Sequence, residues 1–252
     1  MALELYHSHI STCSQKVRIA LAEKGIDWIS RPVDLSKHEN LTPAFLAINP
    51  NGVVPAFVHD GQPIYESTVM CEYLDERWPD GPSIAPDDLV DRALMRAWLR
   101  WIDEVPSMAI RVPSFRNVFL PHFQKKTPEE FAAFVEANPL RKHFFRRMGQ
   151  KGFSDEEYEA AVEQLDRSLA RMEAALDGHD WLVADRFSIA DICITPVIVR
   201  MEDLGMAEMW DGRYRRVADW YARIQERPSF AAAYYPGARI SWMRPGYAAK
   251  AV

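Results

Sequence analysis

The first third of the chain alternates between runs that fit strands and runs that fit helices. Residues 3–7 alternate apolar and polar side chains, as a half-buried strand does. Apolar residues then recur at helical spacing over 17–21, and this run ends at Lys24 and Gly25. A second strand is predicted over 26–33. The chain is therefore expected to begin as a strand–helix–strand unit.

Two further short strands are predicted on either side of Asp60-Gly61, a pair typical of hairpin turns. Pro55 precedes the first of them. Because proline has no N–H to give to a ladder, it fits a strand start or a tight turn, and we predict a cis bond between Val54 and Pro55. A short helix is predicted around 44–48, and another from Ser67 to about residue 78.

The rest of the chain is expected to be helical. Residues 79–86 hold three prolines and a glycine and are the best candidate for a linker. We therefore expect one domain over 1–80 and an all-helical domain over 88–252, with an aromatic tail that packs back. An amphipathic first helix, ended or kinked by Pro106 and Pro113, is predicted from the spacing of Leu94, Trp98, Trp101, Ile102 and Val105.

Later helices are predicted over 154–176 and 214–226, whereas periodicity is weaker over 113–153. Ser188 and Asp191 form a capping-box pattern, which predicts the start of a buried helix.

Composition narrows the possible partners. The net charge of −6 argues against nucleic acid or an anionic membrane as a main partner, and no apolar run reaches 18 residues. The three cysteines show no CxxC spacing, and Cys71 and Cys193 are expected to be buried thiols, which fits a reducing cytoplasm. The seven histidines are dispersed, so no metal site is expected.

Residues 53–68 can describe one small-molecule site. A kink before Pro55 would leave the backbone of Val54 free to pair with an extended peptide. Ser67 falls at a helix start, where free N–H groups hold carboxylates, and Glu66 could hold an ammonium group. A ligand with an amino-acid head and a peptide tail would satisfy all three parts. A plain hairpin capped by Ser67 is the alternative.

This order of elements, with a proline before the third strand, resembles the thioredoxin-like half of glutathione transferases. The resemblance is carried by residues 11–21 (STCSQKVRIAL), 48–55 (INPNGVVP) and 66–69 (ESTV). The Ser188–Asp191 box also recurs in the helical half of that family. The resemblance implies a thioredoxin-like α/β domain followed by an all-helical domain, glutathione as co-substrate without a metal, and a homodimer. It also implies that glutathione is held by His38, Val53, Val54, Pro55, Glu66 and Ser67.

A glutathione thiol must lose its proton to become a nucleophile, and both a hydroxyl donor and a helix N-terminus favour the thiolate. Zeta- and theta-like members place a serine where Ser11 falls. Beta-like bacterial members keep a cysteine where Cys13 falls, and etherase-like members a serine where Ser14 falls. All three are candidates here, and those that do not activate the thiol would cap the helix.

The resemblance narrows to bacterial glutathione-dependent β-etherases of lignin breakdown over residues 1–205. It is carried by 66–74, 92–104 and the segment 129–153, whereas the Ser11–Ser14 turn is nearer zeta-like members. The implied activity is glutathione transfer to an electrophilic aromatic compound, with β-aryl ether cleavage as a candidate reaction. A zeta-like isomerase or dehalogenase and a non-catalytic glutathione-binding module are the alternatives. Candidates for contacting the second substrate are Trp98, Trp101, Met108, Arg111, Phe115 and Phe119.

Overall fold

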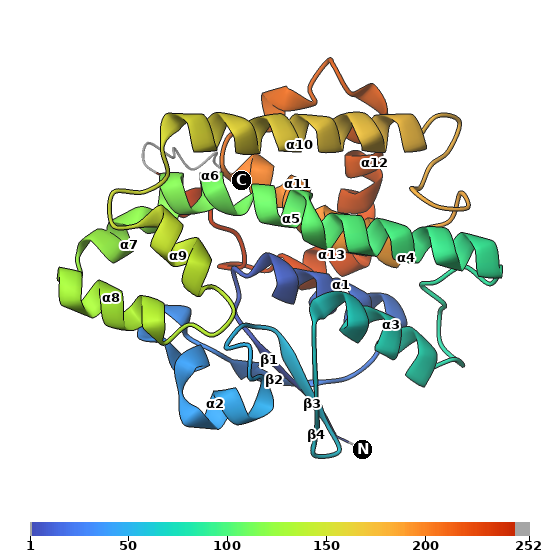
Figure 1. The fold of residues 1–252 in the computed structure, drawn as a ribbon. Coiled ribbons are helices and arrows are strands. Elements are labelled where there is room, and N and C mark those ends of the chain that lie inside the picture. The colour runs from blue at the N-terminus through green and yellow to red at the C-terminus, as the bar shows by residue number, and fades with distance from the viewer. Residues whose placement is uncertain (1, 245–252) are drawn as a thin grey trace.

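A four-stranded mixed sheet lies at one end of the molecule in the computed structural model, which describes residues 2–244 (Figure 1). Its strands are β1 (Leu3–His7), β2 (Ile29–Pro32), β3 (Ala56–His59) and β4 (Gln62–Tyr65), in the order β2-β1-β3-β4. β1 pairs in parallel with β2 and antiparallel with β3, which pairs antiparallel with β4. β2 is an exposed edge strand, and only four of the eight residues predicted for it pair with β1.

Helices cover both faces of this sheet. Leu3 and Leu5 of β1 are buried in the main core beneath α1 (Thr12–Lys24) and α3 (Ser67–Arg77). Tyr6 points the other way and packs against Phe45 of α2 (Pro43–Ile48). Two short turns of 3₁₀-helix, η1 (Leu35–Lys37) and η2 (Glu39–Leu41), join β2 to α2. This is the thioredoxin-like arrangement that the sequence predicted.

Residues 79–86 are anchored between α3 and the helical part. Ile84 is buried, its N–H donates to Asp75 Oδ1 over 2.9 Å, and its carbonyl accepts from Ile189 N over 2.8 Å. The predicted linker is thus a fixed connection, and the division at residue 80 stays a prediction.

The first helix of the helical part is α4 (Leu89–Glu104), and the chain continues beyond Pro106 as α5 (Pro106–Ala109) and α6 (Arg111–Ser114). α4 therefore ends just before Pro106, which begins α5, and Pro113 lies within α6. The predicted apolar stripe of α4 was partly wrong, because Leu94 is 53% exposed while Met95 and Leu99 are buried. The helix has two apolar faces, and Leu94 lies on the outward one with Val90.

Residues 115–148, which showed weak periodicity, form four short helices. These are the π-helix η3 (Phe115–Phe119), α7 (Leu120–Gln124), α8 (Pro128–Glu136) and α9 (Lys142–Met148). They enclose an aromatic cluster separate from the main core, built around Phe123, Phe131 and Phe145. Short helices present too few turns for a clear period, which explains why the pattern did not resolve them.

Two long helices complete the centre. α10 (Asp155–Ala175) lies along the outside, and α11 (Ile189–Asp203) runs through the middle with almost all of its residues buried (Figure 1). The predicted capping box is present, since Ser188 and Asp191 bond each other's backbone. Cys71 and Cys193 are both fully buried free thiols, as predicted.

α12 (Arg215–Glu226) and α13 (Pro228–Ala233) follow, with η4 (Ala207–Met209) before them and η5 (Ser241–Met243) after. The residues after α13 pack back onto α1, because Gln15 Nε2 donates to the Ala238 carbonyl over 2.7 Å. Residues 245–252 of the predicted tail lie outside the described range. Within 2–244, every helix is too short or too polar to cross a membrane.

Candidate active site

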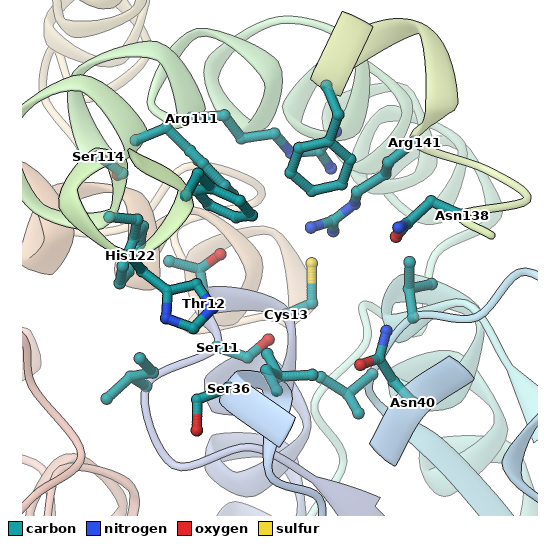
Figure 2. A pocket seen from close by; sticks show the side chains of 18 of the residues that line it. Ser11, Thr12, Cys13, Ser36, Asn40, Arg111, Ser114, His122, Asn138 and Arg141 are labelled. Carbon is teal, nitrogen blue, oxygen red and sulfur yellow. The ribbon is translucent and has the colours of Figure 1, made fainter. Parts of the chain in front are cut away.

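A cavity of about 290 Å³ lies between the start of α1 and the helices α5 to α9 (Figure 2). Its first wall comes from the thioredoxin-like part and its second from the helical part. Residues of the first wall include Ser11, Thr12, Cys13, Ser36, His38, Asn40, Val53 and Val54. Residues of the second include Arg111, Ser114, Phe115, Phe119, His122, Phe123, Phe134, Asn138, Arg141, Phe145 and Arg200.

Ser11 and Cys13 reach this cavity and Ser14 does not. Ser11 is the N-cap of α1, and its Oγ accepts from Ser14 N over 3.3 Å. Among the described residues no acceptor takes the Ser11 hydroxyl hydrogen, so it remains available to a ligand. Ser14 is fully buried, and its Oγ accepts from Ser8 N over 3.3 Å. Ser14 is therefore set aside as a thiol-activating residue, because the first turn of α1 directs its side chain inward.

The residues predicted to hold glutathione line one edge of the cavity or adjoin it. Val53 and Val54 line it, and the Val54–Pro55 bond is cis, as predicted. Pro55, Glu66 and Ser67 are not among the lining residues. Glu66 accepts from Asn51 Nδ2 over 3.0 Å, and Ser67 begins α3.

His38 lines the cavity among aromatic rings. Its ring lies 4.7 Å from the ring of Phe134 and 6.1 Å from that of His122. Burial, with the charges of Lys126 and His122, lowers the pKa of His38 below its ordinary value. A neutral imidazole is thus expected at neutral pH, and a charge-assisted bond to a carboxylate is not.

Three of the six residues predicted to contact a second substrate lie elsewhere. Trp98 and Trp101 pack edge to face with ring centroids 5.1 Å apart, beneath Arg171 of α10. Met108 is 44% exposed and lies outside the lining. The structure does not bring these three to the cavity, because the tryptophan face of α4 turns toward α10, whereas the cavity borders α5 to α9. Arg111, Phe115 and Phe119 do line it.

Arg141 and Arg200 were missed from the sequence. Arg141 precedes α9 in the weakly patterned segment, where nothing marks it among other charges. Arg200 sits within the apolar helix α11, and a lone arginine in such a helix is the signal that could have found it. Arg200 Nη2 donates to the Ile10 carbonyl over 2.5 Å, and burial lowers its pKa to about 10, so it stays cationic.

The cavity is positively charged. Three arginines and two histidines line it, and the described lining holds no aspartate or glutamate. Within residues 2–244, no cluster of three or more His, Cys, Asp or Glu side chains is placed to hold a metal ion.

Two models of one protein family match this chain. The profile described as "Glutathione S-transferase, N-terminal domain" matches residues 10–77, and "Glutathione S-transferase, C-terminal domain" matches 155–223. The chain belongs to the glutathione S-transferase family. It is 36% identical over 196 residues to Protein LigF of Sphingobium sp. (strain NBRC 103272 / SYK-6), covering 77% of this chain and 76% of that protein.

The structural comparison agrees with the sequence. The crystal structure of the β-etherase LigF from Sphingobium sp. strain SYK-6 matches 93% of this transferase with a TM-score of 0.85 and 32% identity, over 99% of its own chain. Maleylacetoacetate isomerase of Pseudomonas aeruginosa is 31% identical over 240 residues, or 92% of this chain and 95% of that enzyme. The family and its fold therefore hold over nearly the whole length.

Proposed function

We propose that this transferase binds glutathione and uses its thiolate to attack an electrophilic aromatic substrate. The observation that carries the proposal is the position of Ser11. This residue caps α1 and opens into a cavity that has Val54 on one side and aromatic rings on the other. A hydroxyl donor and a helix N-terminus then meet at one point, and both stabilise a thiolate.

Glutathione would lie along the first wall. Its glutamyl carboxylate would meet the N–H groups at the start of α3, and its ammonium group would meet Glu66. The cysteinyl backbone would pair with Val54, which brings the sulfur toward Ser11. The glycyl end would then reach Asn40 and neutral His38.

The reaction would be a displacement. The thiolate forms a C–S bond while the leaving group departs with the bonding electron pair. In β-aryl ether cleavage, the attacked carbon lies beside a ketone and the leaving group is an aryloxide. The rings of Phe115, Phe119 and Phe123 support an aryl substrate, and similarity to the β-etherase LigF makes this ether the first candidate.

A second candidate is a glutathione-dependent isomerase. The similarity to maleylacetoacetate isomerase, together with the serine at position 11, favours it.

A conjugation screen tests the proposal. Purified protein and glutathione are given a chloronitroarene, a β-aryl ether ketone or a maleylated diacid, and thioether or isomer formation is followed by mass spectrometry. We expect glutathione-dependent turnover of the ether ketone above that of the Ser11→Ala variant. If glutathione binds in calorimetry but none of the three compounds reacts, the protein is a binding module and the proposal fails.

The assembly we propose is a homodimer. Tyr65, Val69, Leu89, Val90 and Leu94 are exposed apolar residues on β4, α3 and α4. An exposed apolar surface of this kind favours contact with a second copy. Sedimentation should give a dimer, and Leu94→Glu should give a monomer. Three free cysteines fit a reducing cytoplasm as the compartment.

A further inference from the structure

Two arginines on the helical wall of the cavity lack an anionic partner. Arg111 lies on α6, and the one hydrogen bond found for its guanidinium donates to Met108 Sδ over 2.9 Å. Arg141 immediately precedes α9, and its Nε is buried without a hydrogen-bond partner among the described residues. Figure 2 shows the Arg141 guanidinium inside the cavity, facing the sulfur of Cys13. Neither arginine forms an ion pair within residues 2–244.

Each of these two positive charges raises the free energy needed to keep the other guanidinium protonated. Burial and the charge of Arg111 lower the pKa of Arg141 to about 10, which leaves it cationic at neutral pH. A buried guanidinium needs an anion or several acceptors to replace its lost hydration. The phenylalanines beside the pair carry no such group, and Glu66 acts on Arg141 without forming an ion pair with it in the described structure. The pair is therefore complete only when a bound molecule brings a negative charge.

Glutathione itself has two carboxylates, but the proposed binding mode places both along the first wall. The glutamyl end is assigned to Ser67 and the glycyl end to the region of Asn40. Arg111 and Arg141 come instead from the helical wall, beside the rings assigned to the electrophile. We propose that the electrophile carries a carboxylate, which Arg111 and Arg141 bind. This inference rests on the proposed function and narrows its substrate to aromatic acids.

The chemistry of the pair suits such a group. A planar guanidinium can donate two parallel N–H bonds to one carboxylate, with geometric selectivity that a lysine lacks. A neutral analogue of the same shape would leave both cations without an anionic partner. Sites built to bond a polar group discriminate strongly against the analogue that lacks it.

A matched pair of electrophiles tests the inference. Conjugation of 4-chloro-3-nitrobenzoate and 4-chloro-3-nitrobenzamide is measured, and each kcat/KM is divided by the uncatalysed rate with glutathione. We expect the corrected ratio of benzoate to benzamide to be about 10–100 for the wild type. In Arg141→Gln and Arg111→Gln it should fall to near 1, with KM for glutathione little changed. Arg146→Gln on the outer face of α9 is the matched control and should keep the wild-type ratio.

Glutathione is the rival source of the carboxylate, because Glu66 lies close enough to Arg141 for its charge to act on the guanidinium. If Arg141→Gln raises KM for glutathione equally with both arenes and leaves the ratio unchanged, the anion is glutathione and the inference is overturned. A wild-type ratio near 1 overturns it as well.

A binding measurement separates this inference from the proposed function. Wild-type protein with S-methylglutathione is titrated with 3-nitrobenzoate and with 3-nitrobenzamide in a calorimeter. Tighter binding of the benzoate supports the arginine pair even if no arene is conjugated, in which case only the proposed catalysis fails. Equal affinity rejects the pair whether or not the enzyme turns over. Since this arm uses the wild type, it also decides the matter if the variants do not fold.

Discussion

Ser11 serves the fold and the cavity with different atoms of one hydroxyl group. The oxygen accepts the N–H of Ser14 and so caps α1, while the hydrogen stays available to the cavity. Cys13 lies one residue into the same helix and shares the lining. Substituting each residue in turn can therefore separate their roles, since Ser11 caps α1 and Cys13 does not.

We predict that Ser11→Ala lowers turnover by about 10–100-fold, because one hydrogen bond to a thiolate is worth about 1.5–3 kcal/mol. The pH–rate profile should move to higher pH, and glutathione affinity in calorimetry should change little. Loss of the cap should cost only about 1 kcal/mol of stability. If Cys13→Ala loses turnover and Ser11→Ala keeps it, the activating role belongs to Cys13.

A second prediction concerns His7, which is 1% exposed. Its Nδ1 lies 3.2 Å from Arg18 Nη1, which can only donate, so Nδ1 accepts and Nε2 donates to Ser30 Oγ over 2.9 Å. Burial, with the charges of Arg18 and His9, lowers the pKa of His7 to about 4. Between pH 4 and 6.5 the unfolded chain binds a proton at His7 that the folded chain does not bind. The free energy of unfolding therefore decreases as the pH is lowered through this range.

The expected loss attributable to His7 between pH 7 and 4.5 is about 2–3 kcal/mol. Urea unfolding at the two pH values should show a smaller loss by that amount in His7→Gln than in the wild type. His179→Gln, at an exposed position, is the control and should keep the wild-type loss. Equal losses in all three proteins would show that His7 is protonated in the folded state.

Among the helices, α11 depends on one carboxylate. Asp191 Oδ2 accepts from the N–H and hydroxyl of Ser188, and Oδ1 accepts from Leu182 N and Trp220 Nε1. Both oxygens are thus fully used, and they tie the start of α11 to α12 and to the preceding loop. The residue stabilises the central helix and is not part of the cavity lining.

Asp191→Asn should lower the free energy of unfolding by about 2–4 kcal/mol. The new amide NH₂ group would replace one accepting oxygen and would then face the two donors that this oxygen now binds. Urea denaturation at pH 7 measures this. Asp219→Asn, on the exposed face of α12, should change stability by less than about 0.5 kcal/mol. Similar values for the two variants would contradict the assigned role.

The elements that were predicted correctly are those with local signals. Each of these signals acts within a few residues, so the sequence alone predicts the structure it forms. They are the Ser188–Asp191 box, Gly25 at the end of α1 and the proline before β3. The burial of Trp98 and Trp101 depends on which face of α4 meets α10, and that is settled by packing across some 70 residues. Arg141 was missed for the same reason, since the packing of several short helices brings it to the cavity that Ser11 lines.

At the scale of the whole molecule, an ion pair made by a buried lysine joins the two parts. Lys16 of α1 is 1% exposed and lies 2.7 Å from Asp103 Oδ1 at the end of α4, while Thr68 of α3 donates to Oδ2 over 2.9 Å. The Asp103 side chain keeps 42% of its exposure. The lysine therefore depends on the pair far more than the aspartate does.

This asymmetry predicts unequal costs. Asp103→Ala leaves an unpaired ammonium in the core and should cost about 3–5 kcal/mol, whereas Lys16→Met leaves a hydrated carboxylate and should cost less than about 1 kcal/mol. Chemical denaturation compares them, with Glu104→Ala at the neighbouring exposed position as control. Equal costs would mean that the lysine is neutral when buried.

Two side chains of α1 donate hydrogen bonds to the last part of the described chain. Arg18 donates to the carbonyl of Ala233 over 3.1 Å, and Gln15 donates to that of Ala238. Both side chains are buried. During synthesis α1 leaves the ribosome first, but the Ala233 and Ala238 carbonyls that accept from these two side chains are made more than 200 residues later. The N-terminal half can begin to fold early, as domains generally do, but these two side chains of α1 gain their C-terminal acceptors only after the helical part has been made.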